Sequence, residues 1–297
     1  MKFHSMVRFV AATGLCSLLS GCFIISTTRH LPVPKAPGAV VDYTPEQVVD
    51  LLNKRWQALQ TLSATVEVQG TTLKTREGVA RDYTSFPANI LLRTPHMLRV
   101  FGRVPVLRTE LFDMSSDGQT VTMYIPSQNK AYKGPATMRK RSENALLNMR
   151  PGFFIDALAV RGLEPDDLYA VTAETDTLED AQKKHLILVP EYVLSIMRPH
   201  PGSHQLIPVR VITFHRDDML PYEQDIYDAE GNLETHVSYQ GYTDFGGPIY
   251  PSTVTIKRPL DEKQIVLTVD KVQVNMPLSD DQFAAKVPSG TAVQTLE

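Results

Sequence analysis

The clearest hydrophobic pattern in the chain follows the segment YTPEQVVDLLNKRWQALQTL, which starts at Tyr43. Thr44 suits the N-cap of a helix, Pro45 suits its first position, and Gln47 completes a capping box. Steps of three and four residues then define one mostly apolar face with Trp56 beside it: Val48, Leu51, Leu52, Arg55, Leu59 and Leu62. The segment therefore predicts an amphipathic helix that covers another apolar surface.

Most of the remaining chain has the alternation and the β-branched composition of strands. LSATVEVQG alternates Val66 and Val68 with polar neighbours, and turn sequences at residues 116–118 (SDG) and 230–232 (EGN) separate β-rich runs. Further runs rich in Val, Ile and Thr are KHLILVP, LIPVRVITFH, PSTVTIKR and KQIVLTVDKVQVN. Because short turns join successive strands antiparallel, we predict a mainly β fold with some α, built on a long antiparallel sheet.

Several of these strands carry apolar side chains on both expected faces. KQIVLTVDKVQVN divides them into two sets: Ile265, Leu267 and Val269 against Val266, Val272 and Val274. An antiparallel sheet with one face in water alternates more cleanly. The pattern fits a curved sheet whose concave side meets helices or a lipid, although simple packing at sheet edges explains it equally well.

One segment, RSENALLNMRPGFFIDALAVRG, interrupts the strands with helical spacing. Ser142 suits an N-cap, and Pro151 divides the apolar positions, so we predict two short helices hinged at Pro151. The sequence shows no internal repeat and no second linker. We therefore expect a single domain over residues 43–290, followed by a C-terminal tail over residues 291–297.

Residues 1–21 have the parts of an export signal: the basic residues Lys2 and Arg8, an apolar run over residues 9–19, and small residues before Cys22. The run is shorter than the about 20 residues that a membrane-spanning helix needs. The sequence LSGC, ending at Cys22, resembles the lipobox of bacterial lipoproteins, in which the peptide is cut before the cysteine and the cysteine is acylated. The alternative is an ordinary secretory peptide, with Cys22 incidental.

Acylation of Cys22 would shape the rest of the chain. Cys16, the other cysteine, would leave with the signal peptide, so the mature chain would have no disulfide and would be anchored to a membrane by lipid. Residues 22–42 contain three prolines and predict an extended tether of roughly 60 Å, at about 3.1 Å per residue. Phe23 stands where bacterial lipoproteins kept at the inner membrane carry aspartate, which favours the outer membrane and a periplasmic domain.

Composition and charge narrow the classes of partner. Loss of Lys2 and Arg8 would change the formal net charge from −3 to −5, and a mildly acidic chain gives no electrostatic reason to expect nucleic acid. A content of 42% hydrophobic and 21% charged residues is that of a globular protein.

The order of these features resembles the LolA/LolB family of lipoprotein carriers. The resemblance rests on LQTLSATVEVQG after the first helix, SDGQTVTMYIPSQNKAY, the helical insert, YDAEGNLETHVSYQGY and the ending DKVQVNMPLSDDQFAAKVPSG. It implies an unclosed antiparallel β-barrel covered by helices, with an apolar cavity that takes acyl chains of lipoproteins or other amphiphiles. The lipobox and tether are closer to LolB, which is itself a lipoprotein, receives cargo from a periplasmic carrier protein and inserts it into the outer membrane.

The resemblance also implies two kinds of site. LolB engages the membrane through an apolar residue on a loop, and the matching segment here is FGRVPVLRTEL, in which Val104, Val106 and Leu107 are the candidate residues. A buried hairpin turn is the alternative for this segment. LolA has an arginine that holds its helical lid shut, and Arg93 and Arg99 are the candidates, with solvent-facing strand residues as the alternative.

The sequence contains none of the catalytic motifs for which we searched. It has no Gly-x-Ser-x-Gly elbow, no phosphate-binding glycine loop and no His-Glu-x-x-His, so we expect no enzyme activity, catalytic residue or cofactor. His200 and His204 are four apart, but Pro201 and Gly202 between them disfavour a helix, and we expect a surface loop and no metal. The acidic turn QDIYDAEGNLE lacks the ligand spacing of an EF-hand and suits a hairpin.

Two functions from different classes fit these features. The first is an envelope lipoprotein that shields acyl chains in an apolar cavity and takes part in lipoprotein sorting or insertion at the outer membrane. The second is a scaffold lipoprotein of an envelope complex with the same fold, whose cavity is filled by its own side chains. An envelope hydrolase fits poorly, because no nucleophile or metal set accompanies the fold.

Overall fold

The computed structural model describes residues 28–34, 38, 40–74, 77–107, 109–136, 151–179 and 182–296. The chain divides into a small unit, Met1–Lys35 with Thr177–Ile187, and a main unit, Ala36–Asp176 with Leu188–Glu297. The predicted signal peptide, the lipobox with Cys22 and the first of the two predicted short helices lie outside the described residues. In the described part of the chain, no helix combines the length and the hydropathy needed to cross a membrane.

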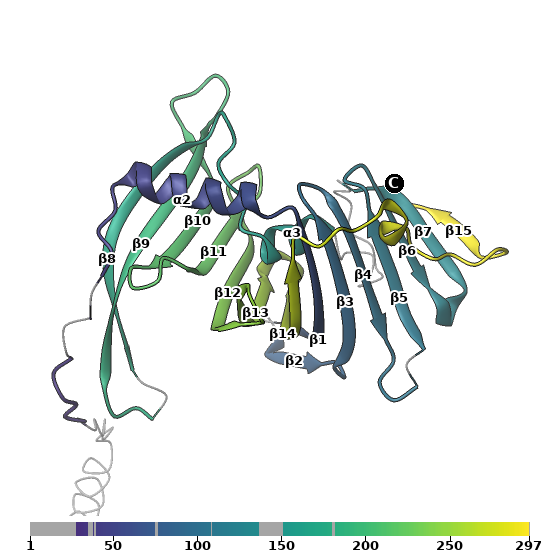
Figure 1. The fold of residues 1–297 in the computed structure, drawn as a ribbon, viewed down its shortest axis with the longest axis horizontal. Helices are drawn as coiled ribbons and strands as arrows, with labels where there is room; N and C mark the ends of the chain where they lie inside the picture. The colour runs from purple at the N-terminus through teal and green to yellow at the C-terminus, as the bar shows by residue number, and fades with distance from the viewer. Residues whose placement is uncertain are drawn as a thin grey trace, which may run out of the picture. The chain divides into compact units, whose positions relative to one another are not determined.

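The described strands form one large sheet (Figure 1). Its order is β15-β7-β6-β5-β4-β3-β1-β14-β13-β12-β11-β10-β9-β8, with β2 paired to β1. The bounds are β1 (Thr61–Lys74), β2 (Val79–Asp82), β3 (Phe86–Arg93), β4 (Met97–Arg103), β5 (Glu110–Ser116), β6 (Thr120–Ile125), β7 (Lys130–Pro135), β8 (Leu168–Glu179), β9 (Leu186–Pro199), β10 (Leu206–His215), β11 (Pro221–Tyr227), β12 (Leu233–Asp244), β13 (Ile249–Arg258), β14 (Lys263–Val274) and β15 (Ala292–Thr295).

The sheet confirms the predicted mainly β architecture. The strand order runs from β15 at one end to β8 at the other, so the sheet is not closed into a barrel. The described registers are antiparallel except between β15 and β7, which pair in parallel. Residues 291–297, expected as a tail, thus include a strand of the sheet.

The two predicted hairpin turns are confirmed. Between β5 and β6, Gly118 has φ +90° and the Asp117 carboxylate accepts from the backbone N–H of Thr120 at 2.7 Å. Between β11 and β12, Gly231 has φ +82° and the Asp228 carboxylate accepts from the N–H of Asn232 at 2.8 Å. Glycine adopts these positive φ values without steric cost, so the turn sequences fix where the strands reverse.

Helix α2 (Pro45–Ala58) confirms the capping box, because the Thr44 hydroxyl accepts from the Gln47 N–H and the Gln47 side chain accepts from the Thr44 N–H. The helix ends before Leu59, its C-cap, and Leu62 belongs to β1 instead of the predicted helical face. Figure 1 shows α2 lying across β9, β10 and β11. Its buried side chains form one apolar cluster with β9, β10 and the β10–β11 turn: Val48, Val49 and Leu52 with Tyr192, Leu194, Ile196, Ile212, Phe214 and Met219.

Helix α3 (Pro151–Leu158) is the second of the predicted short helices, and it is buried against the larger cluster formed by β1, β3–β7 and β12–β14. Side chains of the sheet satisfy the carbonyl groups at and beyond its C-terminal end. The Gln224 amide donates to the Asp156 carbonyl at 2.9 Å, the Tyr250 hydroxyl to the Leu158 carbonyl at 2.8 Å, and Arg210 to the Arg161 and Gly162 carbonyls at 2.7 Å each. These bonds replace the partners that helix ends lack.

The predicted division of β14 into two apolar faces is wrong for Val272 and Val274. The register with β1 shifts between Thr65 and Val66, and on β14 both Asp270 and Lys271 are exposed in succession. This bulge inserts one residue and reverses the alternation beyond it. Val272 therefore lies in the same buried cluster as Leu267, and not on the opposite face.

Three short 3₁₀ helices complete the described elements: η2 (Pro126–Gln128), η4 (Pro259–Asp261) and η5 (Asp280–Phe283). In the small unit, Arg29 of the predicted tether donates to the Glu179 carboxylate at 2.6 Å and to the Lys183 carbonyl at 3.2 Å. The tether is therefore in contact with the turn between β8 and β9 near residue 29.

Candidate functional site

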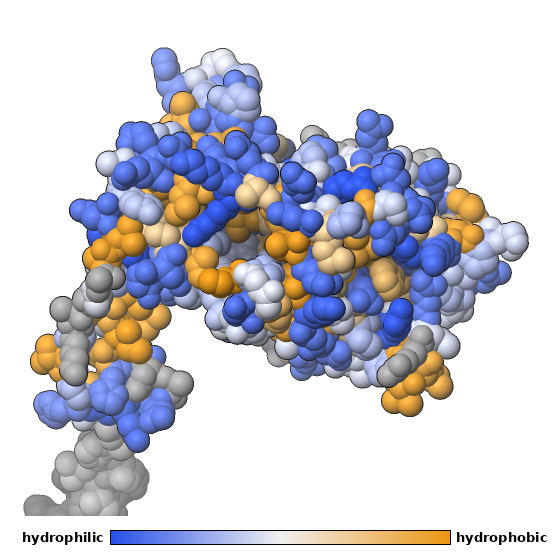
Figure 2. All heavy atoms as spheres, in the orientation of Figure 1, coloured by the Kyte–Doolittle hydropathy of each residue, from blue (hydrophilic) through white to orange (hydrophobic). Residues whose placement is uncertain are grey.

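The main unit contains an apolar cavity of about 280 Å³ beside the C-terminal half of α2. Figure 2 shows the surface hollowed next to this helix and bordered by hydrophobic residues. The lining comes from α2, the end of α3 and the segment after it, β10 and the β10–β11 turn, β12 and β13, and one residue each of β1 and β14. The residues are Leu52, Arg55, Trp56, Leu59, Leu62, Leu158, Ala159, Val160, Phe214, Leu220, Pro221, Tyr239, Tyr242, Pro248, Ile249, Tyr250, Pro251 and Val274.

The sequence of α2 explains one wall of this cavity. The helical spacing that buries Leu52 against β9 and β10 also directs Trp56 toward the cavity, and Leu59 follows at the C-cap. Pro248 and Ile249 lie at the turn between β12 and β13, where Ile249 is 62% exposed. The cavity thus has an aromatic and aliphatic interior with an exposed apolar residue at its edge.

Two of the tyrosine hydroxyl groups at the cavity donate to backbone carbonyls. Tyr242 donates to the Pro221 carbonyl and Tyr250 to the Leu158 carbonyl. Burial raises the pKa of Tyr239, Tyr242 and Tyr250, because a phenolate would lose its hydration. These side chains therefore stay neutral and leave the cavity wall predominantly apolar.

The candidate membrane loop lies between β4 and β5, and its apolar residues face solvent. Val106 is 96% exposed, Leu107 is 74% exposed, and Val104 is half-buried. The buried-turn alternative is therefore wrong for Val106 and Leu107.

The backbone of this loop is strained at its tip. Val106 has φ +67°, and the Leu107 N–H donates to the Pro105 carbonyl at 2.8 Å, which closes a three-residue turn. A β-branched residue rarely adopts such a φ, and γ-turns with positive φ are uncommon. The loop thus holds an apolar side chain outward at a cost in backbone energy, which is a pattern found at functional sites.

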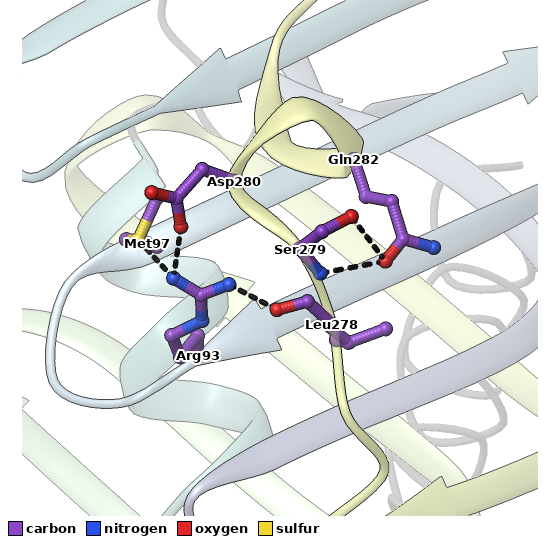
Figure 3. A network of polar contacts seen from close by, with 6 residues as sticks. All are labelled: Arg93, Met97, Leu278, Ser279, Asp280 and Gln282. Carbon is purple, nitrogen blue, oxygen red and sulfur yellow. Dashed lines mark hydrogen bonds and ion pairs between the residues drawn. The ribbon is translucent and has the colours of Figure 1, made fainter.

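Arg93 and Arg99 both hold the segment after β14, which we call the C-terminal strap (residues 275–291). Arg93 donates to the Asp280 carboxylate at 2.6 Å and to the Leu278 carbonyl (Figure 3). Its guanidinium also lies 4.8 Å from the Phe283 ring centroid. Ser279 and Gln282 form a capping box that begins η5 within the strap. Arg93 therefore fastens the strap to the end of β3.

Arg99 is buried and belongs to an ion pair, so the solvent-facing interpretation is wrong for this residue. Its guanidinium donates to both carboxylate oxygens of Asp113 at 2.9 and 2.7 Å, and to the Gln282 carbonyl at 3.0 Å. The Asp113 carboxylate also accepts from the Lys286 N–H at 2.8 Å. The pair joins β4 and β5 to the strap, and the lid role that the resemblance implied for Arg93 or Arg99 stays a prediction.

The remaining candidates from the sequence, Cys22, His200 and His204, do not come together into a site in the described structure. Cys22 lies outside the described residues. His200 and His204 lie in the turn between β9 and β10, where the His200 Nδ1 is 3.0 Å from the Pro201 carbonyl oxygen. Within the described ranges, no three His, Cys, Asp or Glu side chains gather as a metal site would require.

The sequence analysis missed the cavity residues of β12 and β13, because they lie far along the chain from α2. One signal was available in the α2 pattern. Arg55 occupies a position in the otherwise apolar face, and in the structure it lines the cavity.

Comparison with known proteins supports the fold. No protein-family model matches the chain, and no curated protein matches its sequence. A LolA superfamily protein from Nitrosomonas europaea is 13% identical, with a TM-score of 0.50 over 82% of this chain and 98% of its own. A DUF1329 family protein from Desulfovibrio piger is 13% identical, with a TM-score of 0.51 over 80% of this chain and 96% of its own.

These similarities confirm the expected LolA-like fold with its large unclosed antiparallel sheet. At 13% identity they show the fold alone. What the cavity binds must therefore be argued from its own residues.

Proposed function

We propose that this protein is an envelope lipoprotein that binds acyl chains in the apolar cavity and takes part in lipoprotein sorting or insertion at the outer membrane. The observation that carries the proposal is the cavity beside α2, lined by aliphatic and aromatic side chains. The LolA-like fold supports it, because a LolA superfamily protein has the same architecture.

Binding in this proposal needs no covalent chemistry. Each methylene that moves from water into the cavity contributes about 0.8 kcal/mol, so affinity grows with chain length until the cavity is full. Trp56 and Leu59 form the wall on the side of α2, and an outward movement of this part of the helix would open the site. Cargo would then leave for a larger apolar sink such as a bilayer.

We further propose that the β4–β5 loop meets the membrane through Val104, Val106 and Leu107. The exposure of Val106 and Leu107 supports this role, because apolar side chains at the tip of a loop gain from entering the interface. Arg103, at the end of β4, is exposed and suits contact with lipid phosphates.

The anchor in this proposal is acylated Cys22, followed by the tether of residues 22–42. Phe23 favours the outer membrane, so the domain would face the periplasm and receive its cargo from a periplasmic carrier protein. Two membrane attachments, one covalent and one through the loop, would keep the cavity close to the bilayer.

The alternative is a scaffold lipoprotein with the same fold and no cargo. The two buried clusters are consistent with a protein stabilised by its own side chains. The two functions differ in one observable property, because only the carrier has acyl chains bound noncovalently.

Native mass spectrometry of the full chain carrying Cys22→Ser, expressed in cells with an envelope and purified without detergent, separates these functions. The carrier proposal predicts co-purifying amphiphile, and Ile249→Trp, which places a large ring at the edge of the cavity, should lower its occupancy at least threefold. Ile187→Trp, an equally apolar change at a 48% exposed site in the small unit, should leave occupancy unchanged. A chain that is repeatedly free of lipid and does not bind an acylated peptide would contradict the proposal.

A further inference from the structure

The cavity contains one charged side chain. Among the described residues that line it, Arg55 alone is ionised at neutral pH, whereas the others are aliphatic, aromatic, proline or alanine side chains. Arg55 lies in the last turn of α2, between Leu52 and Leu59 on the face that lines the cavity. Burying a guanidinium at this place costs free energy unless a partner replaces its lost hydration.

Part of the Arg55 side chain has a structural partner. One terminal nitrogen, Nη1, donates to the Met219 carbonyl in the β10–β11 turn. A cation in the last helical turn also interacts favourably with the helix dipole. These contacts hold α2 against the turn, but they leave the positive charge without a carboxylate.

The negative charge of Asp218 acts on Arg55 and favours its charged form, but the two side chains form no ion pair. The Asp218 carboxylate accepts from the Leu220 N–H at 2.7 Å and from the Tyr222 hydroxyl at 3.0 Å. None of the ion pairs between described residues includes Arg55, and burial lowers the pKa of its guanidinium because the charged form loses hydration. A half-buried, unpaired cation inside an apolar wall is the arrangement that an incoming anion stabilises.

The size of the cavity limits the rest of the ligand. A 150 Å³ apolar cavity admits benzene, with six carbon atoms, so about 280 Å³ corresponds to roughly eleven carbon atoms. This volume suits one alkyl chain of medium length, or the first part of a longer chain, and not several chains together.

We propose that Arg55 binds the anionic head group of a single-chain amphiphile whose alkyl tail fills the cavity. The inference rests on the proposed function and specifies its ligand class as alkyl carboxylates or alkyl phosphates. Tyr242 and Tyr250 use their hydroxyl protons on backbone carbonyls, and Arg55 is the one cationic donor among the described residues that line the cavity, so we assign recognition of the anionic head group to its guanidinium. Neutral alkyl chains enter the same cavity without this contact.

The test uses the full chain with Cys22→Ser, so that no attached lipid competes for the cavity. Four twelve-carbon probes are titrated by calorimetry below their micelle concentrations: laurate, dodecyl phosphate, 1-dodecanol and dodecyltrimethylammonium. Hydrogen bonds to charged groups correspond to at least about a tenfold change in affinity. We expect one or both anions to bind at least tenfold more tightly than 1-dodecanol, and the cation to bind most weakly.

Variants assign the preference to Arg55. Arg55→Met should abolish the tenfold preference while 1-dodecanol binds within threefold of its original affinity, and Arg55→Lys should retain part of the preference. Lys54→Met removes an exposed charge from the next position of α2 and should leave all four affinities unchanged. The ratio between laurate and dodecyl phosphate distinguishes a carboxylate from a phosphate as the favoured head group.

The outcomes separate this inference from the proposed function. Equal binding of laurate, dodecyl phosphate and 1-dodecanol by the unmodified site would overturn the role of Arg55 and leave acyl binding intact. Absence of binding by all four probes would overturn the proposed function itself. The comparison of probes on the unmodified site decides the matter even if Arg55→Met does not fold.

Discussion

Replacing Val106 and Leu107 by glutamate tests whether the β4–β5 loop enters a membrane. The two side chains are 96% and 74% exposed, so the folded protein gains little from burying them. Complete transfer of such a side chain from water contributes about 1.5–3 kcal/mol, which gives roughly 2.5–5 kcal/mol for the pair when scaled by exposure. Because an interface recovers only part of this energy, we expect vesicle affinity to fall about 10-fold to 100-fold.

The assay is co-sedimentation of the full chain carrying Cys22→Ser with vesicles of mixed phosphatidylethanolamine and phosphatidylglycerol, since a lipid anchor would mask the contribution of the loop. The double variant Val79→Glu with Val293→Glu is the matched control, because both valines are exposed on strands outside the loop. It adds the same charge and should bind vesicles like the unmodified protein.

Unfolding in urea completes the experiment. The loop variant should lose no more than about 1 kcal/mol of stability, as expected for exposed sites. Val106 has φ +67°, and glutamate in its place also has a Cβ, so the backbone strain of the turn stays nearly the same in the variant. Unchanged vesicle binding would refute the membrane role, and a loss of several kcal/mol would show that these side chains support the core.

Two further predictions concern the polar contacts that hold the sheet. Asp113→Ala should lower the free energy of unfolding by about 3–5 kcal/mol, because it leaves buried Arg99 without its carboxylate. Replacing both residues by leucine should restore more than half of this loss. A loss below about 1 kcal/mol in urea titrations of Asp113→Ala would contradict the importance of the pair. The hydrogen bond to Asp225 raises the pKa of His236 above 6.5, so the stability that this bond contributes is present below pH 6.5 and is lost as the pH rises through the raised pKa. Asp225→Asn should therefore flatten the change in the free energy of unfolding between about pH 5.5 and pH 9. An unaltered pH profile of the free energy of unfolding would argue against the bond.

Local signals predicted the local structure well. The Thr44 and Gln47 capping box fixed the start of α2, and turn sequences containing Gly118 and Gly231 fixed two hairpins. Each of these signals acts within four residues of the chain, so it does not depend on tertiary contacts. The antiparallel order followed from the short turns.

Long-range features could not be predicted in the same way. The bulge in β14 depends on pairing with β1, about 200 residues earlier in the chain, and it moved Val272 to the buried face. The Arg99–Asp113 pair and its contact with the strap require three segments to meet. The exposure of Leu107 was equally undetermined, because an apolar residue beside a turn suits a core or a membrane.

The candidate site shows the same division. The α2 pattern contained Arg55, but its meaning depended on Tyr242, Ile249 and Tyr250, which complete the cavity from β12 and β13. A single arginine within an apolar helical face is more often solvent-exposed through its long side chain. Arg55 becomes a charge at an apolar cavity only because β12 and β13 lie opposite it.

Photo-crosslinking tests the central claim, that the cavity beside α2 holds an acyl chain, most directly. A lauric acid analogue with a diazirine on its tail would be bound to the full chain carrying Cys22→Ser, irradiated, and mapped by peptide mass spectrometry. The account predicts labelled peptides from the C-terminal half of α2 and from the facing ends of β12 and β13, around Trp56 and Tyr242. Labelling confined to the β4–β5 loop, or labelling that excess unlabelled laurate does not reduce, would contradict it.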